Sequence, residues 1–390
     1  SVEIFRHFRT QRKFLSLALV LDSLLIVQLV LAGLVVWSVR SPVVTTFHVW
    51  TGALILGTSV LICLRCYRLL ELKALHGVSP QQSRLGGTRF TASPGRTLRA
   101  NILSFWELTK PEITALVLVA VFIGYYLASV DDGAGLMANG WRLFHLLLGS
   151  AFVSGGVAVL NEFLERQYDG LMLRTRMRPI PSGKVSPRQA LIFGVVISVA
   201  GVVYLALTVN FLVSMLSSLT LILYLFVYTP SKRKTSWNTL IGAFPGALPP
   251  VGGWLAVKES VSLGAWILFG ILFLWQIPHF FSIAWIYRKD YGLAGFKMLP
   301  SEDETGVTTG STIVALTAAL LICSLALALV GLAGSFYVAG AAILGTAFVA
   351  VGVDMAVRRT NTGAKRLLLA SVLYLPALLI VLLVDRGLFR

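Results

Sequence analysis

The sequence contains few charged residues. Asp, Glu, Lys and Arg make up only 13% of its 390 residues, against roughly one quarter in a typical soluble domain. Hydrophobic residues make up 56% of the chain. This composition excludes an ordinary soluble globular protein and predicts an integral membrane protein.

Cysteine is also scarce, with three in the chain. Cys63 and Cys66 form a single C-x-x-C, and Cys323 lies far away in the sequence. A structural zinc site needs a second pair of ligands, and three dispersed cysteines do not make a disulfide framework. We therefore favour three small buried apolar side chains over a metal or redox centre.

No segment shows the alternating pattern of a membrane β-barrel. The chain instead contains eleven long apolar runs, most of them near the length that a helix needs to cross a bilayer. Because a spanning backbone must satisfy its own polar groups, we predict an all-α integral membrane fold. The runs cover residues 14–36, 46–64, 113–130, 143–160, 189–207, 210–228, 239–257, 263–286, 312–332, 336–356 and 367–384.

A polar stretch separates the first two runs from the other nine. Residues 71–98 contain Gly, Ser, Pro and Gln without an apolar period, which is typical of a linker. We therefore predict a two-helix membrane segment at 1–70, a cytoplasmic linker at 71–98 and a nine-helix domain at 99–390. The first run is too long for a signal peptide and has no small-residue cleavage site, so we expect a retained helix.

The net charge of +16 could suggest a nucleic-acid partner, but the positions of the basic residues argue against it. Most of them fall in loops on one side of the predicted membrane. The positive-inside rule then places the N-terminus and this face in the cytoplasm, and the C-terminus outside. We interpret most of these bases as orienting the helices and contacting anionic lipid headgroups of the bilayer.

A row of polar residues follows the apolar run at 143–160. Asn161, Glu165 and Asp169 are spaced four apart, which places them on one face of a helix. Mg²⁺ prefers oxygen ligands and commonly uses one or two carboxylates. The spacing therefore predicts a catalytic Mg²⁺ site. Glu162, on the adjacent face of the helix, is a candidate for orienting the ligand side chains.

Basic residues follow about a turn later, in the sequence R-T-R-M-R-P. Arg174 and Arg178 carry planar guanidinium groups suited to phosphate oxygens, and Thr175 adds a hydroxyl donor. Acids that hold a metal, followed by bases that hold phosphate, predict diphosphate chemistry at a membrane surface. The alternative is a solvated helix end that carries ordinary surface charges.

The acidic segment, N-E-x-x-E-x-x-x-D, resembles the first aspartate-rich motif of the UbiA superfamily of intramembrane prenyltransferases, N-D-x-x-D-x-x-x-D. Residues 273–300, F-L-W-Q-I-P-H-F-F-S-I-A-W-I-Y-R-K-D-Y-G-L-A-G-F-K-M-L-P, resemble the haem branch of that superfamily. Two further blocks, 228–235 and 246–250, match in the same order. The resemblance extends over about residues 106–385.

This resemblance implies a UbiA-like bundle of nine transmembrane helices. It implies transfer of the farnesyl group of farnesyl diphosphate to a vinyl group of protohaem IX (haem B), with addition of water, to give haem O. It also implies Mg²⁺ as cofactor and a location in the cell inner membrane, with the active site facing the cytoplasm. Two alternatives stay open, namely prenylation of an aromatic quinone precursor and a non-catalytic haem-binding membrane chaperone.

The resemblance also implies roles for single residues. Asp290 matches the position of the second acidic motif of the superfamily and is expected to join the catalytic metal ligands. Lys232 and Arg233 are candidates for binding phosphates or haem propionates, with topology anchoring as the alternative. His279, one residue after Pro278, is a candidate contact of the porphyrin or its iron, and a packing histidine is the alternative.

The second apolar run places His48 about one turn inside the membrane, where an ionisable residue is a functional candidate. Residues 28–48 resemble one helix pair of haem A synthases, in which such a histidine is an axial haem ligand. The resemblance implies that His48 binds haem together with a haem A synthase or a second copy of the chain. The alternative is a histidine that is hydrogen-bonded inside a two-helix anchor.

Overall fold

The computed structural model of the chain describes residues 19–28, 30, 51, 98–132 and 140–388. The chain divides into two compact units, residues 1–90 and 91–390. Of the first unit, the structure describes one apolar helix over Leu19–Gln28. His48, Cys63 and Cys66 lie outside the described residues, so their roles stay predictions.

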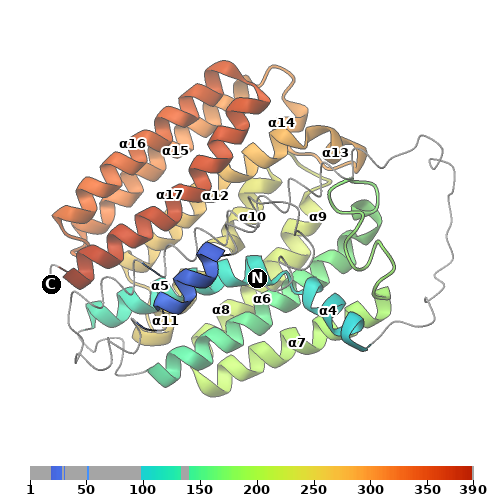
Figure 1. Ribbon diagram of the computed structural model, residues 1–390, viewed down its shortest axis with the longest axis horizontal. Coiled ribbons are helices and arrows are strands. Elements are labelled where there is room, and N and C mark those ends of the chain that lie inside the picture. The colour runs from blue at the N-terminus through green and yellow to red at the C-terminus, as the bar shows by residue number, and fades with distance from the viewer. Residues whose placement is uncertain (1–18, 29, 31–50, 52–97, 133–139, 389–390) are drawn as a thin grey trace. The chain divides into compact units, whose positions relative to one another are not determined.

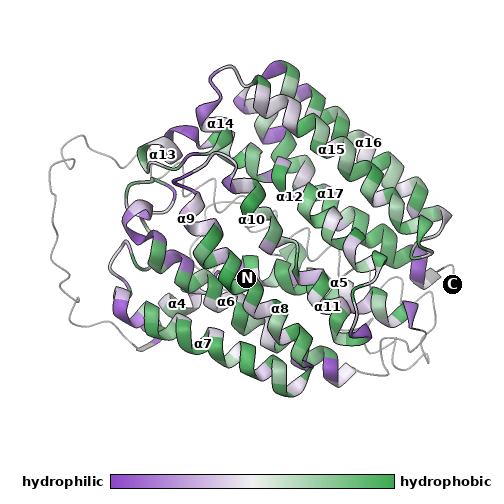
Figure 2. Cartoon of the chain, turned by 180° about the vertical axis from the view of Figure 1, so that it is seen from behind, coloured by the Kyte–Doolittle hydropathy of each residue, from purple (hydrophilic) through white to green (hydrophobic). Residues whose placement is uncertain are grey.

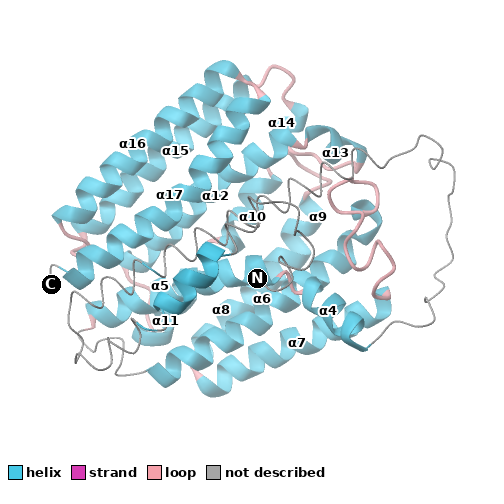
Figure 3. Cartoon of the chain, viewed as in Figure 1, coloured by secondary structure: helices cyan, strands magenta, loops and turns pink. Residues whose placement is uncertain are grey.

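The described residues of the second unit form helices joined by loops, without a strand among them (Figures 1 and 3). Nine helical segments in this part are long and apolar enough to cross a membrane, so the chain is a multi-pass membrane protein. Each coincides with one of the last nine predicted runs, although the second span continues to Asp169, well beyond the predicted end at residue 160. The all-α fold is therefore confirmed. The spans are α5 (Pro111–Asp131), α6 (Gly140–Asp169), α7 (Pro187–Thr208), α8 to α9 (Phe211–Ser231), α10 to α11 (Asn238–Lys258), α12 (Leu263–Ile286), α15 (Val307–Leu329), α16 (Ser335–Arg358) and α17 (Asn361–Leu388).

Two of these spans are interrupted. The fourth consists of α8 (Phe211–Ile222), a π-helical turn η2 (Leu223–Tyr228) and α9 (Thr229–Ser231), and such π turns are frequent at functional sites. The fifth breaks between α10 (Asn238–Gly246) and α11 (Pro249–Lys258). Two consecutive prolines begin α11, and proline has no N–H to continue the hydrogen bonding of the preceding helix.

Three short helices accompany the spans: α4 (Leu98–Leu108), α13 (Arg288–Leu293) and α14 (Leu299–Glu302). The loop after α14 is fixed by Asp303, whose carboxylate accepts hydrogen bonds from the backbone N–H groups of Gly306 (2.9 Å) and Thr309 (2.7 Å). Asp303 therefore helps to begin α15, as acidic side chains often do at a helix start.

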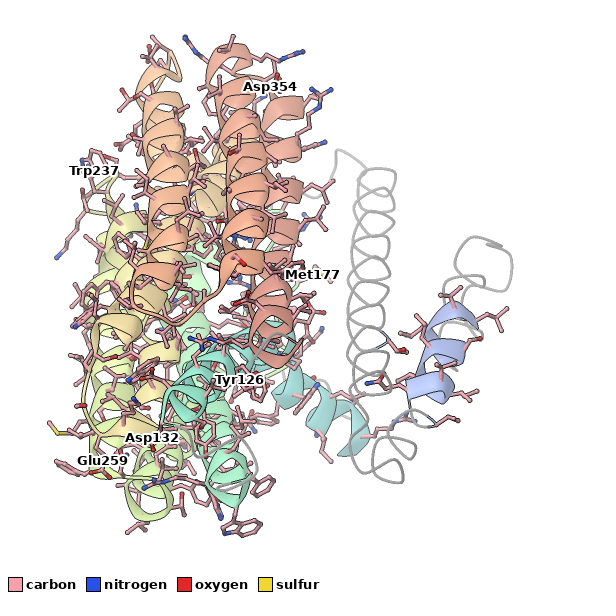
Figure 4. The ribbon with its side chains drawn as sticks, turned by 90° about the vertical axis from the view of Figure 1, so that its left-hand side faces the viewer. Tyr126, Asp132, Met177, Trp237, Glu259 and Asp354 are labelled. Carbon is pink, nitrogen blue, oxygen red and sulfur yellow. The ribbon has the colours of Figure 1, made fainter. Side chains whose placement is uncertain are left out.

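The spans alternate in direction, so their connecting loops collect at two ends. Hydrophobic residues cover the lengths of the helices, whereas hydrophilic residues gather at the helix ends and around α13 and α14 (Figure 2). Asp132 and Glu259 lie close together at one end, and Asp354 lies at the other (Figure 4). The Lys258–Asp131 ion pair ties α11 to α5 at the first end.

Helices α5 and α11 pack closely and join two groups of helices. One core cluster draws on α5 to α8 with α11, and the other draws on α5 and α11 with α12, α15, α16 and α17. The close approach depends on two glycines. A Cβ on Gly124 would lie 1.9 Å from the carbonyl oxygen of Pro250, and a Cβ on Gly253 would lie 2.0 Å from that of Val121.

We expect Gly253→Ala to destabilise the protein, because the added methyl group would overlap backbone atoms that cannot rotate away. Overpacking of this kind typically costs about 1–3 kcal/mol. The measurement is the melting temperature of the purified protein in detergent. Gly252→Ala is the matched control, since its Cβ would meet only the Leu216 side chain at 3.7 Å. An equal loss in both variants would contradict a specific role for the α5–α11 contact.

Candidate active site

The last turns of α6 carry four polar residues that are almost completely buried. Asn161 is 3% exposed, Glu162 1%, Glu165 5% and Asp169 0%. Helix α6 continues through all four, so the predicted spacing does place Asn161, Glu165 and Asp169 on one helix face. Buried carboxylates are tolerated when they are paired or hydrogen-bonded, and each of these has such a partner.

Two of the carboxylates form buried ion pairs with cations from separate loops. Both carboxylate oxygens of Asp169 accept from Nη1 of Arg178, at 2.8 and 2.7 Å, and Oε1 of Glu165 accepts from Nζ of Lys232 at 2.6 Å. Burial alone would lower the pKa of Arg178 and of Lys232, but the facing carboxylates outweigh it and raise both pKa values. Both cations therefore remain protonated.

A third cation, Lys110, reaches the amide of the same helix face. Its Nζ donates to Oδ1 of Asn161 (3.5 Å), and Nδ2 of Asn161 donates to the hydroxyl of Thr229 (3.2 Å). Burial lowers the pKa of Lys110 to about 8, and the charge of Arg178 acts in the same direction. The sequence interpretation missed Lys110. The sequence pattern that could have indicated Lys110 is a lysine directly before Pro111, the proline that begins α5.

Two residues hold the loop that carries Arg178. Oε1 of Glu162 accepts from the backbone N–H of Ile180 (3.1 Å), which agrees with an orienting role. The hydroxyl of Thr175 was predicted to donate to substrate, and that role stays a prediction. In this structure it donates to the carbonyl of Asp169 (2.8 Å), and Thr175 is 1% exposed. Thr175 thus closes the end of α6 and positions the loop.

Arg174 and Arg233 do not join the acidic cluster. Nη2 of Arg174 donates to the hydroxyl of Tyr291 (3.0 Å), and Nη1 of Arg233 donates to that of Tyr168 (2.5 Å). The first contact places α13, with Asp290, beside the loop after α6. The carboxylate of Asp290 has no ion pair or hydrogen bond with the described residues.

A cavity of ≈ 160 Å³ extends into the membrane region from this cluster. Its lining is mainly apolar, and Lys110 and Tyr224 are among its polar members. Lys110 also contacts Asn161, so it links the cavity to the polar face of α6. The other lining residues come from α5, α6, α8 and the α10–α11 break, and they include Val117, Val157, Val213, Leu216, Pro245 and Pro249.

His279 lies elsewhere, in the contact between α12 and α17. Its Nδ1 shares a hydrogen bond with the hydroxyl of Ser371 (2.8 Å), and its ring stacks on Trp275 with centroids 5.2 Å apart. Nε1 of Trp275 donates to the carbonyl of Ser371 (2.7 Å). His279 is not among the residues that line the cavity, and its contact with a porphyrin stays a prediction.

The donor atoms of the α6 face suit Mg²⁺, which prefers carboxylate and carbonyl oxygens. Asn161, Glu165 and Asp169 supply such atoms on one face. Among the described residues, however, no group of three or more His, Cys, Asp or Glu side chains is arranged around a common point. In this structure Glu165 and Asp169 are instead paired with Lys232 and Arg178.

Comparison with known proteins identifies the class of enzyme that this fold and site define. Residues 117–380 match the UbiA prenyltransferase family. A protohaem IX farnesyltransferase from Solibacter usitatus (strain Ellin6076) is 45% identical over 284 residues, which cover 72% of this chain and 97% of that protein. One from Koribacter versatilis (strain Ellin345) is 39% identical over 306 residues, covering 77% and 98%. The chain belongs to the UbiA prenyltransferase family and is a membrane prenyltransferase.

Solved structures share the fold. A digeranylgeranylglyceryl phosphate synthase aligns with a TM-score of 0.62 at 17% identity, over 73% of this chain and 98% of that one. A UbiA homologue from Archaeoglobus fulgidus, bound to GPP and Mg²⁺, aligns with a TM-score of 0.51 at 18% identity, over 72% and 99%. The two alignments establish a common fold, and at identities this low they establish the fold alone.

We expect Arg178→Met to destabilise the protein, because Asp169 would keep a buried charge without its guanidinium. Breaking one side of a buried pair costs about 3–5 kcal/mol. The double variant Asp169→Asn/Arg178→Met removes both charges and should recover most of that loss in thermal or denaturant unfolding. Arg358→Met is the control, since its pair with Asp354 is exposed and worth under about 1 kcal/mol. A double variant as unstable as the single one would contradict this explanation.

Proposed function

We propose that this chain is a protohaem IX farnesyltransferase, which transfers the farnesyl group of farnesyl diphosphate to a vinyl group of protohaem IX and adds water to give haem O. The observation that carries the proposal is the junction of a mainly apolar cavity with a buried cluster of carboxylates and cations. An allylic diphosphate has the same division into an apolar chain and a charged head. The identity of the acceptor is supported by the relatives. They are named protohaem IX farnesyltransferases, and the alignment covers almost their whole length.

The donor substrate binds with its diphosphate among Lys110, Arg178 and Lys232 and with its farnesyl chain in the cavity. Lys110 both lines the cavity and contacts the polar cluster. It therefore marks the point where the diphosphate joins the farnesyl group of the donor. When the diphosphate binds, Arg178 and Lys232 exchange carboxylate partners for phosphate oxygens, which leaves Asp169 and Glu165 available. Charge-assisted hydrogen bonds of this kind are among the strongest in proteins.

Asn161, Glu165 and Asp169, with Asp290 from α13, are the residues that would hold Mg²⁺. When bound, the ion neutralises charge on the leaving diphosphate. The UbiA homologue from A. fulgidus that is bound to GPP and Mg²⁺ has this fold and supports the assignment. Thr175 and Glu162 act indirectly, because they hold in place the loop that carries Arg178.

The reaction begins when the bond between C1 of the farnesyl group and the diphosphate oxygen breaks, leaving an allylic cation. The three cations stabilise the negative charge that develops on the leaving group. The ring of Tyr224, which lines the cavity, stabilises the allylic cation and excludes water from it. A vinyl carbon of protohaem then bonds to C1, water adds to the resulting cation beside the porphyrin ring, and a proton is released.

We propose that the enzyme works in the cell inner membrane with its N-terminus and active site facing the cytoplasm, because basic residues concentrate in the loops of that side. We further propose three parts, at 1–70, 71–98 and 99–390. In this proposal the first part is a haem A synthase-like helix pair in which His48 binds haem. A haem A synthase or a second copy of the chain is its partner, and His279 contacts the substrate haem.

The proposed activity predicts a specific product. Purified protein in lipid nanodiscs, supplied with Mg²⁺, farnesyl diphosphate and protohaem, should yield haem O by mass spectrometry, and it should not prenylate 4-hydroxybenzoate. Asp169→Asn keeps the shape of the side chain but removes its charge, so turnover should fall on the order of 10²-fold. Prenylated benzoate without haem O would support the quinone alternative. Binding of protohaem without any product would support the chaperone alternative.

The cavity assignment predicts a change in chain-length preference. Val213 lines the cavity roughly 16 Å along its helix from Tyr224. Val213→Phe should therefore fill the far end and raise the KM for farnesyl diphosphate by about tenfold, since overpacking costs about 1–3 kcal/mol. The KM for geranyl diphosphate, one isoprene unit shorter, should change less. Val199→Phe, on the exposed face of α7, is the control, and an equal effect on both donors would contradict the assignment.

A further inference from the structure

Two arginines beside the active site have no acidic partner in the described part of the chain. Arg174, after α6, and Arg233, after α9, are both exposed, and each donates to a tyrosine hydroxyl, Tyr291 and Tyr168 respectively. Each guanidinium also lies over the ring of its tyrosine, at 5.6 Å for Arg174 and 4.6 Å for Arg233. These contacts hold two exposed cations in defined positions, at a lower entropy cost for binding than free side chains would have.

Aromatic rings separate these arginines from the buried ion pairs. Phe296 is buried, and its ring centroid lies 5.7 Å from that of Tyr168 and 6.2 Å from that of Tyr291. Nζ of Lys232, which pairs with Glu165, lies 5.9 Å from the centroid of Phe296. Lys232 therefore contacts the buried ring of this cluster, whereas the two arginines contact its two outer rings.

The surface next to the arginines is also apolar. Leu171 and Leu173 precede Arg174 in the loop after α6, and Leu293 follows Tyr291 at the end of α13. All three leucines are exposed. A ligand suited to this surface carries an apolar face together with separate anionic groups. Exposed leucines and aromatic rings bind an apolar face, and guanidinium groups bind carboxylates in a planar, bidentate geometry.

We propose that Arg174 and Arg233 bind the two propionates of the tetrapyrrole acceptor. This assignment rests on the proposed function and names a site for its second substrate. Farnesyl diphosphate carries its charge on one compact group, and Lys110, Arg178 and Lys232 already surround the carboxylates that serve that group. Protohaem instead carries two propionates on one edge of a flat apolar macrocycle, with the vinyl groups away from that edge.

The assignment also orients the acceptor. Propionates held by these loops lie at the cytoplasmic end of the bundle, where charge remains in contact with water and lipid headgroups. The vinyl groups then point toward the membrane interior, where the cavity begins at Lys110. The arginines would thus determine specificity for a tetrapyrrole with two carboxylates and determine which of its edges meets the farnesyl carbon.

The test compares protohaem with its dimethyl ester, in which both carboxylates are neutral. Each is titrated into the purified full chain without farnesyl diphosphate, and binding is followed by the Soret band. Arg174→Gln/Arg233→Gln should raise the Kd for protohaem about tenfold or more, as loss of charged hydrogen bonds does, and should leave the Kd for the ester unchanged. Arg176→Gln/Lys234→Gln removes two exposed charges from the same loops and should have little effect on either ligand.

Three results would overturn the assignment. They are an unchanged Kd for protohaem in the arginine variant, an equal loss for protohaem and its ester, and a rise in the KM for farnesyl diphosphate of similar size. The third result would place the arginines at the diphosphate. A chain that shows the arginine-dependent binding but makes no haem O would support this site and refute the proposed farnesyl transfer, so the two proposals can fail separately.

Discussion

Carboxylates buried at the end of a membrane helix must be neutralised, and this requirement organises one end of the bundle. Asp169 and Glu165 lie on α6, but their cations come from elsewhere, Arg178 from the loop after α6 and Lys232 from the loop after α9. An unpaired buried charge costs several kcal/mol. The two pairs therefore fix two loops against one helix.

The same pairs explain how the site accepts a charged donor. In this structure each of these two cations is held by a carboxylate. In the proposed function a diphosphate competes for the cations, and the released carboxylates become available to a divalent metal. This exchange needs side-chain movement and little movement of the helices. Arg174 and Arg233 are held by tyrosines instead of carboxylates, which under our proposal leaves them available to the acceptor.

Much of this arrangement follows from the sequence, because length and apolarity determine the spans and a spacing of four determines the face of α6. Arg178 was predicted to bind phosphate, and Lys232 to bind phosphates or haem propionates. Their pairing with carboxylates depends on loop conformations that no local pattern encodes. Lys110 was missed for the same reason, since it is distant from α6 in sequence. Tyr224 lies in a π turn, and such turns have no strong sequence signature.

The central claim is that the paired charges form the diphosphate site, and binding to a variant that lacks one pair tests it most directly. Glu165→Gln/Lys232→Met removes both charges together, so we expect the variant to melt close to the parent protein. Farnesyl diphosphate with Mg²⁺ should raise the melting temperature of the parent protein, and the account predicts that this rise is lost in the variant. A variant that melts like the parent and retains the full Mg²⁺-dependent rise would contradict the account.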